Sequence, residues 1–201
     1  MKLHKKLLKK KFEDEVRNVL PANVSMDQVE VCFEDEARVG QQGTLTRVWT
    51  KKGTRTRLTK QGQFINAYIW GIVFPQRDLG FSYIFPSCDT DIMNELLKEL
   101  SKIVSPGKHA LLILDNAAWH KSKGIKLPQN VSILPLPPYS PELNPVEQIW
   151  EQLRQRYLAN RSFIDYNDIV NACSDAWNGF VSVPGAIKQL CSRDWATIGA
   201  L

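Results

Sequence analysis

The sequence of 201 residues is poor in cysteine, and none of its cysteines forms a metal-binding pair. No CxxC motif occurs, and the four cysteines are scattered along the chain at Cys32, Cys88, Cys173 and Cys191. A zinc site made of thiolates is therefore not expected, because such sites need closely spaced cysteines. Isolated cysteines are typical of reduced, mostly buried thiols in a cytoplasmic protein.

The sequence also lacks a long apolar segment. No run approaches the ~20 apolar residues that a membrane-spanning helix requires. The basic start, MKLHKKLLKKKF, has no apolar core of the kind found in signal peptides. Hydrophobic residues nevertheless make up 43% of the chain, which is enough for a folded core. We therefore expect a folded protein that is neither embedded in a membrane nor secreted.

Acidic residues are absent from one long stretch, between Ala37 and Arg77. The net charge of +5 is a mild indication of a polyanionic partner, and this stretch concentrates the positive charge. We predict a basic insertion near residues 38–62 that contacts the phosphates of a nucleic acid, although a charge run can also be a solvated face. Its basic residues are Arg38, Arg47, Lys51, Lys52, Arg55, Arg57 and Lys60.

Residues 1–21 are predicted to form a basic helix or linker apart from the main domain. Apolar residues recur at helical spacing from Leu3 to Phe12, and Pro21 ends the pattern. The segment could be a linker helix, an arm that contacts DNA or the remnant of a preceding domain. Its lysines could equally form a solvated face.

Residues 22–201 show the pattern of one α/β domain. Strands are predicted at 29–36, 64–74, 81–85, 110–114 and 131–136, and helices at 90–103, 145–161, 167–180 and 184–190. The first strand alternates, so we expect it to be half-buried with Glu34 and Glu36 on its polar face. Turns between the early strands favour antiparallel pairing, and the later crossovers favour parallel pairing. A mixed five-stranded sheet flanked by helices is the pattern of the ribonuclease-H-like fold.

Two aspartates follow apolar strand sequences. Asp115 comes directly after the apolar run Ala110–Leu114, and in open α/β sheets functional sites form at the carboxyl ends of strands. Counting in steps of two places Asp35 on the apolar face of the first strand. If that strand ends early, Glu34 or Glu36 could take its place. As alternatives, Asp115 could cap its own loop and Asp35 could be a solvated turn residue.

The segment PPYSPELNPVEQIW predicts a stiff loop that leads into a helix. Asn144 is suited to the N-cap and Pro145 to the first helical position, and Glu147 falls three residues after the cap. The apolar stripe of this helix, which includes Tyr157, is expected to pack on the sheet, and Glu147 flanks it beside Trp150. Glu147 could stand at the rim where helix meets sheet, or it could be only the third residue of a capping box.

The three carboxylates belong to elements that are expected to converge at one edge of the sheet. Asp35, Asp115 and Glu147 would then crowd together, and like charges at close range repel unless something neutralises them. A divalent cation does so, and hard cations prefer oxygen ligands. The sequence therefore predicts a divalent-metal site formed by these three side chains.

Three motifs together resemble a known family. FEDEARVG, LLILDNAAWH and LPPYSPELNPVEQIW occur in that order, and they are similar to motifs of the DDE superfamily endonucleases. The resemblance is to the catalytic domain of mariner-type bacterial insertion-sequence transposases. It runs from about Val29 to about Arg161, and the Tyr-Ser-Pro-Glu-Leu-Asn-Pro-x-Glu run is its most specific part.

The resemblance implies that Asp35, Asp115 and Glu147 are the catalytic triad and hold Mg²⁺. Mn²⁺ is expected to substitute, and two ions are expected. The implied reaction is DNA strand cleavage and strand transfer during cut-and-paste transposition. Asn116 and His120 match the family's Asp-Asn-x-x-x-His pattern. Asn116 could orient Asp115 or be a turn residue, and His120 could approach the scissile phosphate or be a surface or supporting residue.

Partners also follow from the resemblance. We expect double-stranded DNA at transposon ends and target sites and a second copy in a homodimer. Met1 to Val19 is too short for the N-terminal helix-turn-helix domains of complete members, so such a part could be separately encoded, or the chain could be a fragment or a decayed copy. The expected location is the bacterial cytoplasm, near the nucleoid. The alternatives are an inactive or domesticated DNA-binding remnant and a nuclease for RNA–DNA hybrids. The intact triad argues against the first, and the motif from Tyr139 to Glu147 argues against the second.

Overall fold

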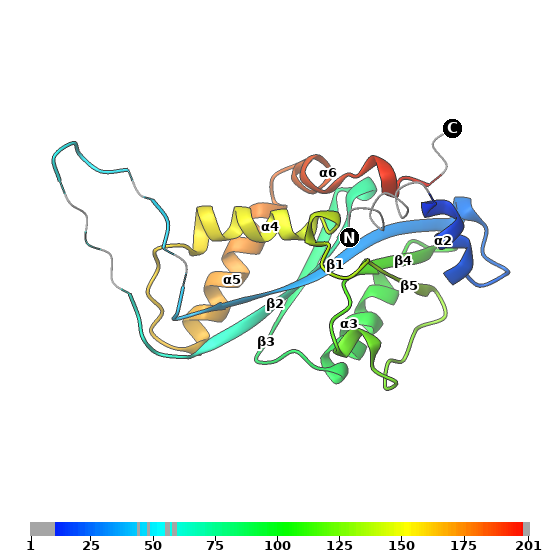
Figure 1. The fold of residues 1–201 in the computed structure, drawn as a ribbon, viewed down its shortest axis with the longest axis horizontal. Coiled ribbons are helices and arrows are strands. Elements are labelled where there is room, and N and C mark those ends of the chain that lie inside the picture. The colour runs from blue at the N-terminus through cyan, green and yellow to red at the C-terminus, as the bar shows by residue number, and fades with distance from the viewer. Residues whose placement is uncertain (1–10, 44, 48, 55–56, 58–59, 199–201) are drawn as a thin grey trace.

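The protein is described here from a computed structural model that covers residues 11–43, 45–47, 49–54, 57 and 60–198. A central sheet carries helices on both of its faces (Figure 1). In this part of the chain the strands form one sheet in the order β3-β2-β1-β4-β5. None of the described helices has both the length and the apolar character required to cross a bilayer.

The central strand, β1 (Val29–Gly40), sets the topology of the sheet. It pairs antiparallel with β2 (Asn66–Phe74) and parallel with β4 (His109–Leu114). On the outer sides, β3 (Leu79–Phe85) is antiparallel to β2, and β5 (Val131–Pro135) is parallel to β4. The predicted mixed sheet of five strands is therefore confirmed.

Two apolar cores lie on opposite faces of the sheet (Figure 1). One face packs against α3 (Thr90–Ile103), whose N-cap is Asp89. The other face packs against α2 (Phe12–Val19), α4 (Val146–Leu153), α5 (Tyr166–Val181) and α6 (Ala186–Cys191). Short 3-10 turns occur at Met26–Gln28 (η1), Pro75–Arg77 (η2), Trp119–Lys121 (η3), Pro141–Leu143 (η4) and Asp194–Ala196 (η6).

The prediction that β1 is half-buried is wrong. Glu34, which alternation places on a polar face, has no exposed surface, and Cys32 on the same face is also fully buried. The reason is that α3 and the η3 turn cover this face, which a strand pattern alone does not reveal. The strand also continues to Gly40, four residues beyond its predicted end, so Arg38 lies in β1 itself.

The helix predicted at 145–161 is divided in two. The α-helix α4 ends at Leu153, and a π-helical turn, η5 (Arg154–Leu158), follows it, with the Ala159 amide donating to the Arg154 carbonyl at 2.7 Å. This wider turn changes which side chains face the sheet. Tyr157, predicted on the buried stripe, is 39% exposed, whereas Trp150, before the π turn, is buried as expected.

Gly71 of β2 makes room for two indoles beside the site. It is the register partner of Asp35 on β1. A Cβ atom at this position would lie 2.8 Å from Trp150 Cη2 and 2.9 Å from Trp177 Cη2, which is too close for any real contact. A glycine is therefore required here, and the resulting close packing brings the Trp150 indole against the sheet next to Asp35.

The predicted N-terminal basic helix is described only in its second half, as α2. Residues 1–10 of the predicted basic helix lie outside the described residues. Its remainder, α2, buries Phe12 and Val16 in the same core as Phe33, with Phe12 edge-on to Trp195 at 5.3 Å between ring centroids.

The described residues between β1 and β2 extend away from the helices at the left of Figure 1.

Candidate active site

Asp35, Asp115 and Glu147 line one cavity of about 430 Å³. They come from three separate parts of the chain: the middle of β1, the residue after β4 and the first turn of α4. The cavity is roofed by the proline-rich loop that begins at Pro137 and leads into α4. The convergence predicted for the three carboxylates is therefore present in the fold.

Asp35 is held by the helix that covers it. Its Oδ2 accepts a hydrogen bond from Trp150 Nε1 at 2.8 Å, and only 8% of the residue is exposed. Burial, followed by the negative charge of Glu147, raises the pKa of Asp35 well above its usual range. The alternative of a solvated turn residue is wrong, and the parity count that chose Asp35 as the cavity-facing residue of β1 agrees with its position.

Asp115 serves its own loop and the cavity at the same time. Its Oδ1 accepts from the Ala117 amide at 2.8 Å and lies 2.9 Å from His120 Nδ1. The hydrogen bond with His120 is the main cause that lowers the pKa of Asp115. Asp115 thus caps the loop after β4 and also lines the cavity, although these two roles were stated as alternatives. Asn116 donates to the carbonyl of Leu136, which ties this loop to the chain that follows β5.

Glu147 is positioned through Asn144, which precedes Pro145, the N-cap of α4, so the N-cap predicted at Asn144 lies one residue too early. Asn144 Oδ1 accepts from the Val146 amide at 3.2 Å, and Asn144 Nδ2 donates to the Glu34 carbonyl at 2.7 Å. The second bond fastens the start of α4 to β1, one residue from Asp35. Among the described residues, no hydrogen bond returns from the Glu147 side chain to Asn144, so the capping box is incomplete and the Glu147 carboxylate faces the cavity.

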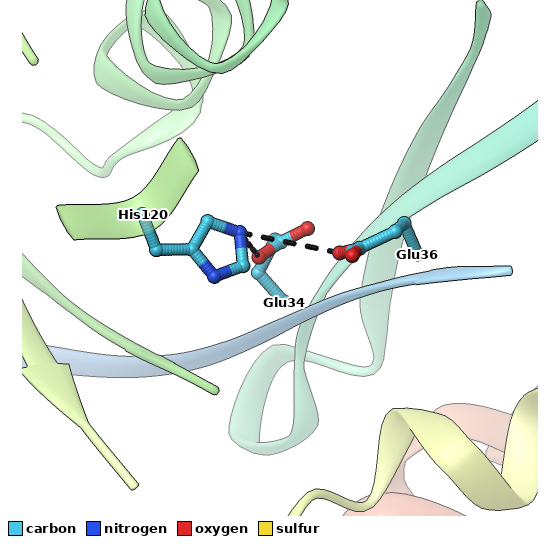
Figure 2. A group of neighbouring side chains, drawn as sticks. All are labelled: Glu34, Glu36 and His120. Carbon is cyan, nitrogen blue, oxygen red and sulfur yellow. Dashed lines mark ion pairs between the residues drawn. The ribbon is translucent and has the colours of Figure 1, made fainter. Parts of the chain in front are cut away.

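His120 lies on the other side of β1 from the cavity. It is 7% exposed, so a surface position is wrong, and its ring faces Glu34 and Glu36 (Figure 2). His120 Nε2 is 3.3 Å from Glu34 Oε2 and 4.0 Å from Glu36 Oε2. This geometry directs the ring toward Glu34 and Glu36, which is the supporting position and not the alternative of an approach to a phosphate. The sequence does not indicate this grouping, because His120 follows β4 and is far from Glu34 and Glu36 along the chain.

The donor set of the cavity suits a hard divalent cation. Asp35, Asp115 and Glu147 offer only carboxylate oxygens, which Mg²⁺ and Mn²⁺ prefer. Burial and the negative charge of Glu147 both make the ionised form of Asp35 unfavourable, and this raises its pKa. A bound cation would stabilise the ionised form. Lys121, which the sequence analysis did not single out, also lines the cavity.

Within the described part of the chain, none of the predicted DNA-contacting residues lines the cavity of the carboxylates. Six of them are exposed, namely Arg38, Arg47, Lys51, Lys52, Arg57 and Lys60. Arg55 lies outside the described residues. Arg38 lines a separate cavity of about 240 Å³ together with Arg154 of the π turn, a basic residue that no sequence pattern indicated. The basic segment is thus solvent-accessible, and its first member stands beside a second positive charge.

Comparison with known sequences identifies relatives of this chain. A family model described as DDE superfamily endonuclease matches residues 30–170. The uncharacterized protein y4pE/y4sA of Sinorhizobium fredii is 47% identical over 130 residues, which are 65% of this chain and 96% of that protein. The insertion element IS630 uncharacterized 39 kDa protein of Shigella sonnei is 25% identical over 151 residues, 73% of this chain and 41% of that protein.

Solved structures of the Mos1 mariner transposase share the fold. The paired-end complex with Mn matches with a TM-score of 0.65 and 14% identity, over 92% of this chain and 56% of that one. The isolated Mos1 catalytic domain matches with a TM-score of 0.54 and 13% identity, over 79% of this chain and 73% of that one. The chain spans about half the length of the protein in the Mos1 complexes.

The fold of the sheet and the segment matched by the family model both agree with a DDE endonuclease domain. The mixed sheet flanked by helices is the ribonuclease-H-like architecture of the Mos1 catalytic domain. The matched residues 30–170 include all three carboxylates of the cavity and both motifs that follow β4 and β5. Because this match covers most of the sequence, the chain belongs to the DDE superfamily endonucleases.

Proposed function

We propose that this chain is a transposase catalytic domain that cleaves and joins DNA strands during cut-and-paste transposition. The main support for this proposal is one cavity at the carboxyl end of β4, which is lined by Asp35, Asp115 and Glu147 from three distant segments. Membership of the DDE superfamily endonucleases supports the reaction class. The Mos1 structures, whose names include a paired-end complex and a strand transfer complex, support DNA as the substrate.

Asp35, Asp115 and Glu147 would hold Mg²⁺ or Mn²⁺, and we propose two ions. When bound, such cations activate the attacking oxygen and stabilise the leaving oxygen of a phosphodiester. No side-chain nucleophile is required for this chemistry, which fits a cavity that brings three carboxylates together. The Mos1 paired-end complexes named with Mg and with Mn support the choice of cation.

The surrounding residues fix these carboxylates before substrate binds. The Trp150 indole holds Asp35, and the Ala117 amide with His120 holds Asp115. Asn144 anchors the start of α4 and so sets the position of Glu147. A site whose side chains are locked by neighbours loses less freedom when it meets its substrate. Lys121 adds a positive charge to the cavity wall, which favours a phosphodiester there.

The reaction can be tested with purified protein, supercoiled plasmid DNA, and a duplex that carries the inverted repeats flanking the reading frame. We expect nicked and linear products that require Mg²⁺ or Mn²⁺ and disappear with a chelator. Binding of the duplex without any cleavage by folded protein would favour a DNA-binding remnant. Cleavage of the RNA strand of an RNA–DNA hybrid, with DNA left intact, would favour a ribonuclease.

The exposed basic segment is proposed to contact the DNA backbone. Association with duplex DNA should weaken steeply with salt, because each neutralised phosphate contributes a slope of about −0.9 in log–log form. Replacing Lys51 and Lys52 by glutamine should reduce that slope by about 2, one for each lysine. The measurement is fluorescence anisotropy across a salt series. Lys98→Gln with Lys102→Gln on α3 removes equal charge elsewhere, and an equal loss of slope there would contradict the assignment.

Assembly extends the same proposal. A homodimer that pairs two transposon ends, and a separately encoded helix-turn-helix part that recognises them, would complete the activity. The described residues between β1 and β2 are mostly exposed, so they can contact a second molecule or a DNA duplex. Sedimentation of the chain with and without end-bearing DNA would show whether pairing depends on the substrate.

A further inference from the structure

A second polar cluster lies on the face of β1 opposite Asp35. Within the described residues, every buried side-chain nitrogen or oxygen without a hydrogen-bond partner belongs to it. The six atoms are Glu34 Oε1, Glu34 Oε2, Glu36 Oε2, Trp70 Nε1, Trp119 Nε1 and His120 Nε2. The His120 ring centroid lies 6.3 Å from that of Trp70 and 5.9 Å from that of Trp119. Unsatisfied buried polar groups are costly, so the unpaired Glu34, Glu36 and His120 atoms indicate a missing partner, whereas the two indole N–H groups are donors that a cation does not satisfy.

The spacing of these atoms fits ligands of one cation. His120 Nε2 is 3.3 Å from Glu34 Oε2 and 4.0 Å from Glu36 Oε2, and one ligand atom from each residue lies within 4.8 Å of the others. Zinc bonds to nitrogen and oxygen of about 2.0–2.2 Å in a tetrahedral site place ligand atoms about 3.3–3.6 Å apart. The pair of His120 Nε2 and Glu34 Oε2 has this spacing, whereas Glu36 Oε2, at 4.0 Å from Nε2, would have to move closer when a cation binds. Figure 2 shows both carboxylates directed toward the same side of the imidazole.

The hydrogen bond between His120 Nδ1 and Asp115 favours the tautomer of His120 that can bind a metal through Nε2. If His120 Nδ1 carries the proton and donates to Asp115 Oδ1 at 2.9 Å, the lone pair of Nε2 faces Glu34 and Glu36. A carboxylate behind a histidine in this way is the usual support of a metal-ligating imidazole. A lone pair that faces two carboxylates without a positive charge between them would be repulsive.

Charge balance also favours a cation over a proton. A proton held between His120 Nε2 and the nearer carboxylate oxygen, Glu34 Oε2, is the rival occupant of this cluster. One N–H can serve only one carboxylate, and Glu34 would still bury an oxygen without a partner. A divalent cation with two carboxylates and a neutral imidazole gives a group of zero net charge, which burial tolerates best.

We propose that Glu34, Glu36 and His120 bind a divalent transition-metal cation of the Zn²⁺ type. The imidazole nitrogen selects this class over Mg²⁺, which prefers oxygen ligands alone. Glu36, whose side chain is 14% exposed, gives the cation a path from solvent, whereas Glu34 is fully buried. The site is separate from the cavity of the catalytic triad and goes beyond the proposed function, but it holds the histidine that bonds Asp115.

The test is a titration of the chelator-treated full chain with Zn²⁺ by calorimetry, with elemental analysis of the dialysed product. We expect one tightly bound Zn²⁺ for each chain that excess Mg²⁺ does not displace. Glu34→Gln and Glu36→Gln should each weaken binding by at least about 100-fold, since loss of a supporting residue alone costs about 10–100-fold. Glu30→Gln, a matched change on β1 whose carboxylate pairs with Arg77, should leave binding unchanged.

A variant of the other cavity separates this proposal from the proposed function. Asp35→Asn combined with Glu147→Gln should retain the tight Zn²⁺ even if it has lost all DNA cleavage. The proposal would be overturned if the double variant lost the tight Zn²⁺, or if Glu34→Gln and Glu36→Gln both retained it fully. It would also be overturned if the wild-type chain bound no Zn²⁺. If Glu34→Gln fails to give the circular dichroism of the wild type, Glu36→Gln, at the exposed rim, decides.

Discussion

Asp115→Asn is expected to lower cation-dependent DNA cleavage by about a thousandfold or more without unfolding the chain. Asparagine keeps the shape of the side chain and an oxygen for the Ala117 amide, so the loop after β4 keeps its anchor. It removes the negative charge that would hold a divalent cation, and such cations contribute several kcal/mol to phosphoryl transfer. About 1.4 kcal/mol corresponds to tenfold in rate, which gives the expected loss. Glu147→Gln should behave in the same way.

The controls use the same chemical change away from the cavity. Glu151→Gln lies one turn beyond Glu147 on α4, where Glu151 is exposed and accepts a hydrogen bond from Gln155. Asp175→Asn replaces an exposed aspartate of α5. Both controls should cleave plasmid DNA at the wild-type rate in Mg²⁺ or Mn²⁺. Cleavage by Asp115→Asn at the rate of Asp175→Asn would refute the proposed role of the triad.

The sequence predicted the strands that position the site because their signals are local. The apolar run before Asp115 and the alternation before Asp35 are periodic patterns that backbone geometry translates directly into a strand and a face. The start of α4 was predicted to within one residue from the chemistry of Asn144 and Pro145: Pro145 is the N-cap, with helical dihedral angles, and Asn144 accepts a hydrogen bond from the Val146 amide. These local rules were sufficient to bring the three carboxylates together.

The parts that the sequence did not predict depend on contacts between distant segments. Glu34 and Glu36 alternate with apolar residues as solvated side chains do, yet the turn after β4 brings His120 against them. Nothing in the alternation of β1 indicates what covers its second face. The π turn after Leu153 was also missed, because helical periodicity does not distinguish an α-helix from one that widens for a single turn.

The burial of Asp35 links the stability of the fold to the chemistry of the site. A buried carboxylate beside Glu147 is unfavourable in the metal-free protein, as the raised pKa of Asp35 records. The same burial holds the carboxylate in place through Trp150 and excludes water from it. The residue most useful to a bound cation is thus one that destabilises the chain when the cation is removed.

Asp35→Asn is therefore expected to raise the melting temperature of the metal-free chain while it lowers DNA cleavage. Asparagine removes the buried charge but still offers Trp150 Nε1 an acceptor, so the indole keeps its hydrogen bond. The gain should reach several degrees at pH 8, because about 1 kcal/mol shifts the midpoint by roughly 2–4 °C in a chain of this size. Asp35→Ala provides the contrast, since an unpartnered indole costs about 1–3 kcal/mol and should reduce or reverse the gain.

The dependence of this gain on pH has a definite sign. Because the pKa of Asp35 is raised in the folded state, the folded chain retains a proton that the unfolded chain has lost. The wild type keeps that stability below the ordinary aspartate pKa of about 4 and loses it as pH rises through the raised value. The melting temperature of Asp35→Asn should therefore exceed that of the wild type by a margin that grows with pH and shrinks when Mg²⁺ is added. Differential scanning calorimetry from pH 4 to pH 9, with and without Mg²⁺, measures this margin, and one that is constant with pH would show that Asp35 carries no buried charge.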